Sequence, residues 1–396
     1  MKRHSIVPVI MFHSVGLEKH NWVFSHISEP LEIFEEKIYL ISKLGYNSIF
    51  WNELYMYMKG GLKLPKKSIM LTFDDGYLDN WVYAYPILKK HGVKATIFIN
   101  PEFIDPSTSL RPNLEDVWAR KIFFQNLKPA GFLSWTEMRE MERSGLIDIQ
   151  SHALTHTWYF SSSKIIDFHR PNDGYVWLIW NHFPERKYKY LTEKQEDLVR
   201  YGVPIYTFEK SLIVRRYFED LNLNKALADF VEEKGGASFF THSNWKKILL
   251  DFTEKYKKHN KINDRIESEE EYKQRVYHEL SFSKKIIEEN LNKEVKFLCF
   301  PGGGYNNIVL KLAKEAGYIA TTLSSKDRST FRNKPGVDPS KIKRISSATW
   351  CNLKGKRLGY AKPKYFISHI ESHKGSIFHK ILCRIYKLEQ LFMRLL

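Results

Sequence analysis

Cysteine is scarce in this chain of 396 residues. The three cysteines, Cys299, Cys351 and Cys383, are an odd number and include no CxxC pair. Disulfide-dependent secreted domains carry more cysteines, usually in an even number. The sequence therefore predicts no disulfide framework, which fits a reducing compartment.

Long hydrophobic runs are also missing. No stretch approaches the roughly 18 consecutive apolar residues of a membrane-spanning helix. Residues 1–4 (MKRH) lead directly into a short apolar strand and do not resemble a signal peptide. We therefore expect no spanning helix and no export. The expected location is cytoplasmic, with peripheral contact to the inner membrane as an open alternative.

Acidic residues are few relative to basic ones. The chain has 45 Asp and Glu against 62 Lys and Arg, a net charge of +17 at pH 7. The basic residues are scattered and do not form a nucleic-acid reading motif, so we expect no nucleic-acid partner. An acidic glycan or a lipid phosphate suits this charge better.

The last 46 residues concentrate this charge. Residues 351–396 carry ten Lys or Arg and two Glu. From Ile377, apolar residues recur at helical spacing with Lys380, Arg384 and Lys387 between them. The pattern predicts a basic amphipathic helix, which suits either an anionic membrane surface or packing on the rest of the chain.

Two adjacent carboxylates follow an apolar run that predicts a buried strand. Residues 72–76 read TFDDG, so Asp74 and Asp75 end the strand and Gly76 turns the chain. Desolvating an ionised carboxylate is unfavourable, so such a pair usually serves a cation, a reacting proton or a set of donors. An Asp-Asp-Gly turn is also an ordinary way to leave a strand.

Two histidines follow another short strand, predicted over residues 146–150. His152 and His156 are four residues apart, on one helical turn or in a loop beyond the strand. With a carboxylate, two imidazoles make the three-ligand pattern of a catalytic zinc site. With 15 histidines in the chain, a chance pair is the alternative.

Two further strand ends carry special residues. Residues 301–304 (PGGG) follow a predicted strand over 295–300, and His13 follows one over 6–12. A proline and three glycines expose backbone amides that can approach an oxyanion, although a flexible loop has the same composition. Strands alternating with helices, with polar residues at the strand ends, are typical of an α/β barrel.

These motifs together resemble the polysaccharide deacetylases of carbohydrate esterase family 4, the NodB-homology proteins. The resemblance lies in residues 72–76, in His152 and His156, and in residues 300–302, and it extends to residues 7–16, 88–99 and 133–138. It implies a distorted (β/α) barrel that removes an N-acetyl group from an amino sugar with a divalent metal, expected to be zinc.

Residue roles follow from the resemblance. It implies Asp75, His152 and His156 as metal ligands and Asp74 as general base. It also implies a substrate loop at Pro301, Gly302, Gly303 and Tyr305, with the Gly302 amide facing the oxyanion.

The sequence departs from the family pattern at two places. Cys299 stands where many members have the arginine that pairs with the catalytic aspartate, so the partner of Asp74 is unexplained. The late histidine that protonates the leaving amine has no clear match. His13 is our preferred catalytic acid and His369 the alternative.

The spacing of the motifs predicts the domain organisation. We expect a barrel in two parts, residues 1–157 and 269–350, an inserted subdomain over 158–268 and the C-terminal extension over 351–396. Trp177 and Trp180 in the insertion suit either a sugar-stacking platform or a small core.

The predicted function is a metal-dependent carbohydrate N-deacetylase, acting on a linear amide bond. Its substrate would be a bacterial cell-surface glycan or a lipid-linked or nucleotide-linked precursor, as in O-antigen, capsule or exopolysaccharide assembly. The alternatives are a deformylase or other small-acyl amidase on a lipid-linked sugar, and a catalytically silent glycan-binding protein.

Overall fold

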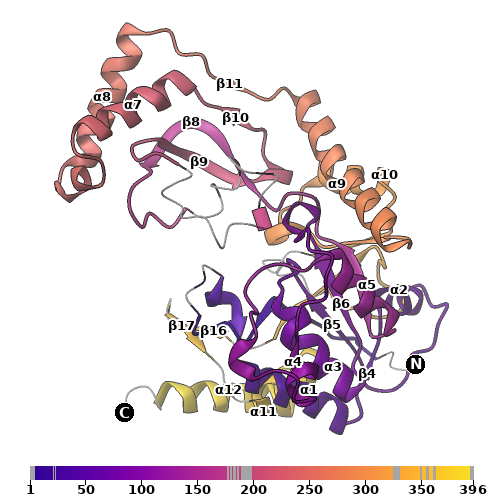
Figure 1. Cartoon of the computed structure of the whole chain (residues 1–396). Helices are drawn as coiled ribbons and strands as arrows, with labels where there is room; N and C mark the ends of the chain where they lie inside the picture. Colours follow the sequence, from indigo (N-terminus) through magenta and orange to yellow (C-terminus); the bar gives the residue numbers. More distant parts are fainter. Residues whose placement is uncertain are drawn as a thin grey trace. The chain divides into compact units, whose positions relative to one another are not determined.

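The chain divides into two compact units in this computed structural model (Figure 1). The first comprises Met1–Ala153, Ser283–Gly303 and Gly317–Leu396, and the second Leu154–Phe282 and Gly304–Ala316. The structure describes residues 5–392 except 21, 23, 176, 177, 179, 180, 182, 183, 185, 186, 189–198, 324–330, 348, 349, 354, 355 and 360–362.

A parallel sheet of nine strands forms the centre of the first unit. Along its main path the order is β14-β13-β12-β7-β6-β5-β1-β15, and β4 pairs with β5. Every pairing in this sheet is parallel. The strands are β1 (Val9–Phe12), β4 (Asn47–Ser48), β5 (Ser68–Phe73), β6 (Ala95–Ile99), β7 (Ile147–Ser151), β12 (Phe297–Leu298), β13 (Ala320–Thr322), β14 (Lys341–Ile342) and β15 (Ile345–Ser346).

The sheet curls until its two ends meet. The terminal strands β14 and β15 are separated in sequence by Lys343 and Arg344 alone. A link of this length spans at most about 11 Å, so the two edges must lie close together. Six strands each send one buried side chain into a shared core: Val9, Met70, Phe98, Phe297, Ala320 and Ile342. The predicted distorted barrel is confirmed.

Helices surround these strands (Figure 1). Their ends follow local sequence signals: α5 begins where Ser134 and Glu137 form a reciprocal capping box, and α3 ends at Gly92 in left-handed backbone. The helices are α1 (Leu31–Lys43), α2 (Trp51–Met58), α3 (Tyr85–His91), α4 (Leu114–Trp118), α5 (Trp135–Arg143), α11 (Pro363–His373) and α12 (Ile377–Phe392). Two small sheets pair β2 (Ser14–Val15) with β3 (Ser28–Glu29), and β16 (Trp350–Leu353) with β17 (Lys356–Gly359).

The second unit is built on pairs of antiparallel strands with helices. β8 (Trp158–Phe168) pairs with β9 (Pro204–Lys210), and β10 (Tyr217–Phe218) pairs with β11 (Arg265–Ile266). Phe168 and apolar residues of two helices form its core. The helices are α7 (Leu221–Glu233), α8 (Trp245–His259), the first part of α9 (Glu269–Leu291) and α10 (Asn307–Glu315).

The second unit is larger than the predicted insertion. It contains all of residues 158–268 and extends past them at both ends, and it takes α10 as well. Trp177 and Trp180 lie outside the described residues, so their role stays a prediction.

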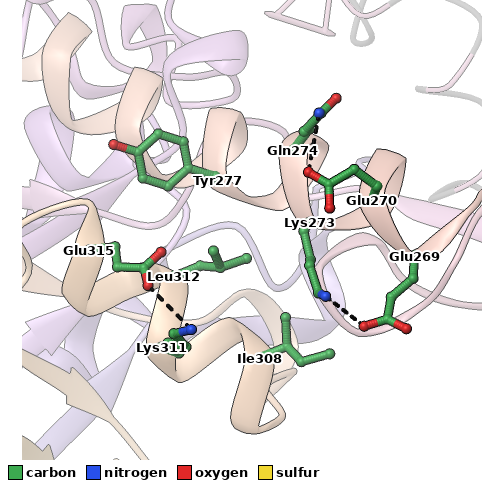
Figure 2. A pocket seen from close by; sticks show the side chains of 9 residues that line it. All are labelled: Glu269, Glu270, Lys273, Gln274, Tyr277, Ile308, Lys311, Leu312 and Glu315. Carbon is green, nitrogen blue, oxygen red and sulfur yellow. Dashed lines mark hydrogen bonds and ion pairs between the residues drawn. The ribbon is translucent and has the colours of Figure 1, made fainter.

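A surface groove of about 580 Å³ lies between α9 and α10 (Figure 2). Its charged side chains pair within each helix: Lys273 with Glu269 at 2.6 Å, and Lys311 with Glu315 at 3.7 Å. In each pair the positive and the negative charge neutralise each other. None of the residues predicted to act in catalysis or metal binding lines the groove.

Candidate active site

The ends of neighbouring strands bring the predicted residues together. Phe12 of β1 lies beside Phe73 of β5, and Ser151 of β7 lies beside Leu298 of β12. The residues that follow these strands therefore gather at the carboxyl edge of the sheet, where α/β barrels build their sites. They are His13, Asp74, Asp75, His152 and Cys299.

Asp75, His152 and His156 form a candidate metal centre. Their ligand atoms all lie within 4.8 Å of one another, and all three residues are buried. His152 Nε2 is 3.2 Å from Asp75 Oδ1. The residues between the two histidines are neither helix nor strand, so the HxxxH motif lies in a loop beyond β7.

The hydrogen bonding of His152 suits a metal ligand. Its Nδ1 lies 2.8 Å from the backbone carbonyl of Cys299. A carbonyl only accepts, so Nδ1 carries the proton and the Nε2 lone pair faces Asp75. One carboxylate and two imidazoles, with one ring fixed in this way, fit a divalent cation with an open fourth position.

A second group, Asp74, His152 and Cys299, is equally compact. This group already has a positively charged partner. The Arg344 guanidinium contacts both Asp74 and Cys299 Sγ. A divalent ion beside that guanidinium would be repelled. The group with Asp75 and His156 is therefore the better candidate for a metal centre.

Two of the three candidate ligands have left-handed backbone. Asp75 has φ 75° and His156 has φ 43°. Asp and His adopt this region more readily than most residues, but it still disfavours a side chain by about 1–2 kcal/mol. Such strain persists where the surroundings hold it, and it concentrates at functional sites.

Arg344 supplies the partner of Asp74 that the sequence left unexplained. Its Nη1 donates to Asp74 Oδ1 at 2.6 Å, and its Nη2 donates to Oδ2 at 2.8 Å. Nη2 also lies 3.0 Å from Cys299 Sγ. Arg344 lies in the two-residue link between β14 and β15, which we call the seam, so it reaches Asp74 from a different part of the chain than the expected arginine.

This ion pair sets the charge of Asp74. Burial raises the pKa of the Asp74 carboxyl, but the Arg344 guanidinium, with smaller contributions from His152 and His13, holds that pKa below its ordinary value. An ionised carboxylate with a fixed orientation is what a general base requires. His13 Nε2 lies 3.9 Å from Asp74 Oδ2 and is partly exposed.

Asp79 and Asn80 hold the segment that carries His13. Asn80 Nδ2 donates to the His13 carbonyl at 2.9 Å, and Asp79 accepts from Ser14 Oγ at 2.7 Å and from the Val15 amide at 2.9 Å. Sequence reasoning missed both residues. Their position just after the TFDDG motif was the available signal.

His369 lies in a different environment. It sits on α11, where its ring stacks on Tyr365 at 6.0 Å. The charges that act on it are those of Lys387 and Lys37, not those of the predicted site. The geometry therefore favours His13 over His369 as the catalytic acid.

The glycine loop turns tightly after β12. Gly302 and Gly303 have φ 55° and 68°, which favours glycine, and the Gly303 amide donates to the Phe300 carbonyl at 2.9 Å. Pro301 is buried, Gly302 is exposed, and Tyr305 is half-buried. A Cβ at Gly304 would lie 2.6 Å from the Lys210 side chain, so a larger residue there would require that side chain to shift.

Contacts within the second unit hold the residues on both sides of His156. Thr155 Oγ1 donates to Glu279 at 2.7 Å, and its carbonyl accepts from Lys187 at 2.7 Å. Thr157 Oγ1 donates to Asn181 at 2.6 Å. These contacts hold the chain on both sides of one candidate ligand, His156.

Comparisons with known proteins agree with this architecture. The sequence matches the polysaccharide deacetylase family over residues 61–203 and 170–321. The chain belongs to the polysaccharide deacetylase family.

Among curated proteins, it is 25% identical over 155 residues to the poly-β-1,6-N-acetyl-D-glucosamine N-deacetylase of Escherichia coli, which covers 39% of this chain and 21% of that protein. It is 31% identical over 145 residues to the enzyme of the same name from Staphylococcus aureus, covering 36% and 41%. The matched segment thus spans less than half of either relative.

A solved structure of similar fold is a de-N-acetylase from Aggregatibacter actinomycetemcomitans. The TM-score is 0.53 at 19% identity, covering 91% of this chain and 99% of that one. The deacetylase domain of BpsB from Bordetella bronchiseptica gives 0.50 at 17% identity, covering 86% and 95%. At these identities the likeness is one of fold.

Proposed function

We propose that this protein is a metal-dependent N-deacetylase that removes an acetyl group from an amino sugar. The observation that carries the proposal is the three-ligand group of Asp75, His152 and His156 beside an Asp74 paired with Arg344. A protein that only binds glycans has no need of a buried base with a fixed charge next to a cation site.

Different residues of the site would bind the metal and transfer the proton during amide hydrolysis. Asp75, His152 and His156 would hold the ion, and zinc is the proposed metal. When bound, a divalent ion supplies Lewis acidity to water and to the acyl carbonyl. Asp74 takes a proton from the attacking water, and Arg344 keeps Asp74 ionised and oriented.

The leaving amine needs a proton. His13 is the proposed donor because it lies at the same strand edge and 3.9 Å from Asp74. Asn80 and Asp79 hold its segment in place. The proposed oxyanion donor is the Gly302 amide, in the turn that begins at Pro301.

The proposed substrate is an N-acetylated glycan of the bacterial cell surface, or its lipid-linked or nucleotide-linked precursor. Among finished polymers, the names of the two curated relatives support β-1,6-linked N-acetylglucosamine as the first to try. Precursors of O-antigen, capsule and exopolysaccharide are the next substrates to test. We propose a cytoplasmic location, which favours precursors over finished polymer.

The test is acyl release by the purified full chain after loading with zinc. Incubation with β-1,6-linked N-acetylglucosamine oligomers, and with lipid-linked and nucleotide-linked N-acetyl sugars, should release acetate. Release of formate from an N-formyl sugar in place of acetate would identify a deformylase. Absence of stoichiometric metal, together with Asp75→Ala unchanged in every assay, would refute the enzyme and favour a glycan-binding protein.

A further inference from the structure

Helix α12 exposes a continuous apolar stripe. Ile377, Ile381, Ile385 and Leu388 follow one another at one-turn spacing and are 76, 51, 51 and 57% exposed. Soluble proteins seldom leave an apolar surface of this length uncovered. Three more side chains on the helix widen the stripe: Phe378 at 65%, Leu391 at 39% and Phe392 at 65%.

The opposite side of α12 is the one that packs. Cys383 is 8% exposed and contacts Tyr365 of α11, with Tyr386 beside them. The rings of Tyr365 and Tyr386 meet at 6.3 Å. The helix is therefore docked in the fold through one face, and docking does not cover the apolar stripe.

Basic residues border the stripe along one side. Lys380, Arg384 and Lys387 recur at spacings of four and three, which places them on one flank of the helix. Glu389 is the one acidic residue in the sequence of α12. An exposed apolar stripe with a basic flank is the pattern of a helix that lies in the interface of an anionic bilayer.

We propose that α12 binds the surface of an anionic phospholipid bilayer, with its apolar stripe in the acyl boundary and Lys380, Arg384 and Lys387 against the phosphates. The net charge of the chain favours an anionic bilayer over a second copy of the chain as the partner of α12. A net charge of +17 makes two copies repel each other, whereas it attracts anionic lipid. Among the described residues, no helix is long and apolar enough to cross a membrane.

None of the α12 residues belongs to the proposed active site, so membrane binding and catalysis can be tested separately. It is tested with the full chain and vesicles of phosphatidylcholine alone or with 30% phosphatidylglycerol. Co-sedimentation should occur with the anionic vesicles, should weaken about tenfold or more on neutral ones, and should weaken as salt is raised.

Matched variants separate the two components of binding. Ile381→Asp and Ile385→Asp should each weaken partitioning by about tenfold or more, because an apolar side chain is replaced by an anion. Phe123→Asp, at a position that is 71% exposed outside α12, should leave it unchanged.

The basic flank has its own control. Lys380→Glu with Lys387→Glu should abolish the preference for anionic vesicles, whereas Lys247→Glu with Lys255→Glu on exposed positions of α8 should retain most of it. Circular dichroism and melting curves check that each variant folds.

Equal binding to neutral and anionic vesicles, or binding that Ile385→Asp does not change, would overturn the proposal. A dimer seen by light scattering that Ile385→Asp dissociates, without vesicle binding by the parent chain, would overturn it in favour of self-association.

Discussion

Arg344 forms a two-point ion pair with Asp74, across 270 residues of sequence. The pair is buried, and each partner depends on the other because an isolated charge in this position would be strongly unfavourable. The ion pair joins the TFDDG motif to the link between the last two strands of the barrel.

Arg344→Met should therefore lower both stability and turnover. Leaving Asp74 ionised and unpaired should cost about 3–5 kcal/mol in free energy of unfolding. Adding Asp74→Asn should recover most of that stability without recovering activity. Lys341→Met, at an exposed position near the same seam, is the control and should change neither. Denaturant unfolding curves measure the stability of all four proteins.

Arg344→Lys tests the effect of the guanidinium on the base. Arg344 lowers the pKa of Asp74 against the effect of burial, so a weaker partner should let that pKa rise. A base with a higher pKa is protonated at a higher pH, so the acid limb of kcat/KM should move to higher pH. We expect turnover at neutral pH to fall by about 10²-fold. An unshifted acid limb would show that Arg344 does not set the charge of Asp74.

His13 and His156 should respond differently to replacement. His156→Ala should lose bound zinc, as measured by metal analysis and by a competing chelator, because it removes a ligand. His13→Ala should keep the zinc and lower turnover by about 10²-fold, because it removes only the proposed acid. Loss of metal from His13→Ala would make His13 a ligand or a structural support.

Residues of the second unit should influence metal affinity from outside the ligand set. Asn181→Ala and Glu279→Gln loosen the backbone beside His156, so we expect zinc affinity to fall by about tenfold. Arg200→Gln, whose ion pairs lie on an exposed surface of the same unit, is the control. Equal zinc affinity in all of these proteins would show that the contacts serve stability alone.

Acid should destabilise the α11 region. Burial, reinforced by Lys387 and Lys37, lowers the pKa of His369 to about 4, from about 6.5 in the unfolded chain. The unfolded state therefore binds more protons between these values, and stability present above pH 6.5 is lost as the pH falls. Between pH 7 and 5 this loss is about 2 kcal/mol. His369→Gln should remove that part of the loss in unfolding curves; an identical loss in the variant would contradict the assignment.

The sequence predicts what is encoded locally. The TFDDG motif and the HxxxH pair lie in consecutive residues at strand ends, so their chemistry and spacing are visible without a fold. The bounds of α7 follow from the Asp220 cap and the apolar period. The predicted strand over 295–300 is shorter, because the chain turns into the site where the Cys299 carbonyl accepts a hydrogen bond from His152 Nδ1.

No local sequence motif identifies Arg344 as the partner of Asp74. It is one of 62 basic residues, and nothing in its neighbourhood marks it as different from the others. Only closure of the sheet brings it to Asp74, and closure depends on pairings between strands far apart in sequence. The contacts of Asn181 and Glu279 to the His156 loop were hidden for the same reason.

The position of Arg344 at the seam has a consequence during synthesis. The ribosome delivers Asp74 long before Arg344, and the strands on both sides of Asp74 can pair while its counter-charge does not yet exist. The carboxylate must stay hydrated or protonated until the last barrel strands dock. The buried carboxylate thus acquires its counter-charge only when the last strands of the barrel are in place.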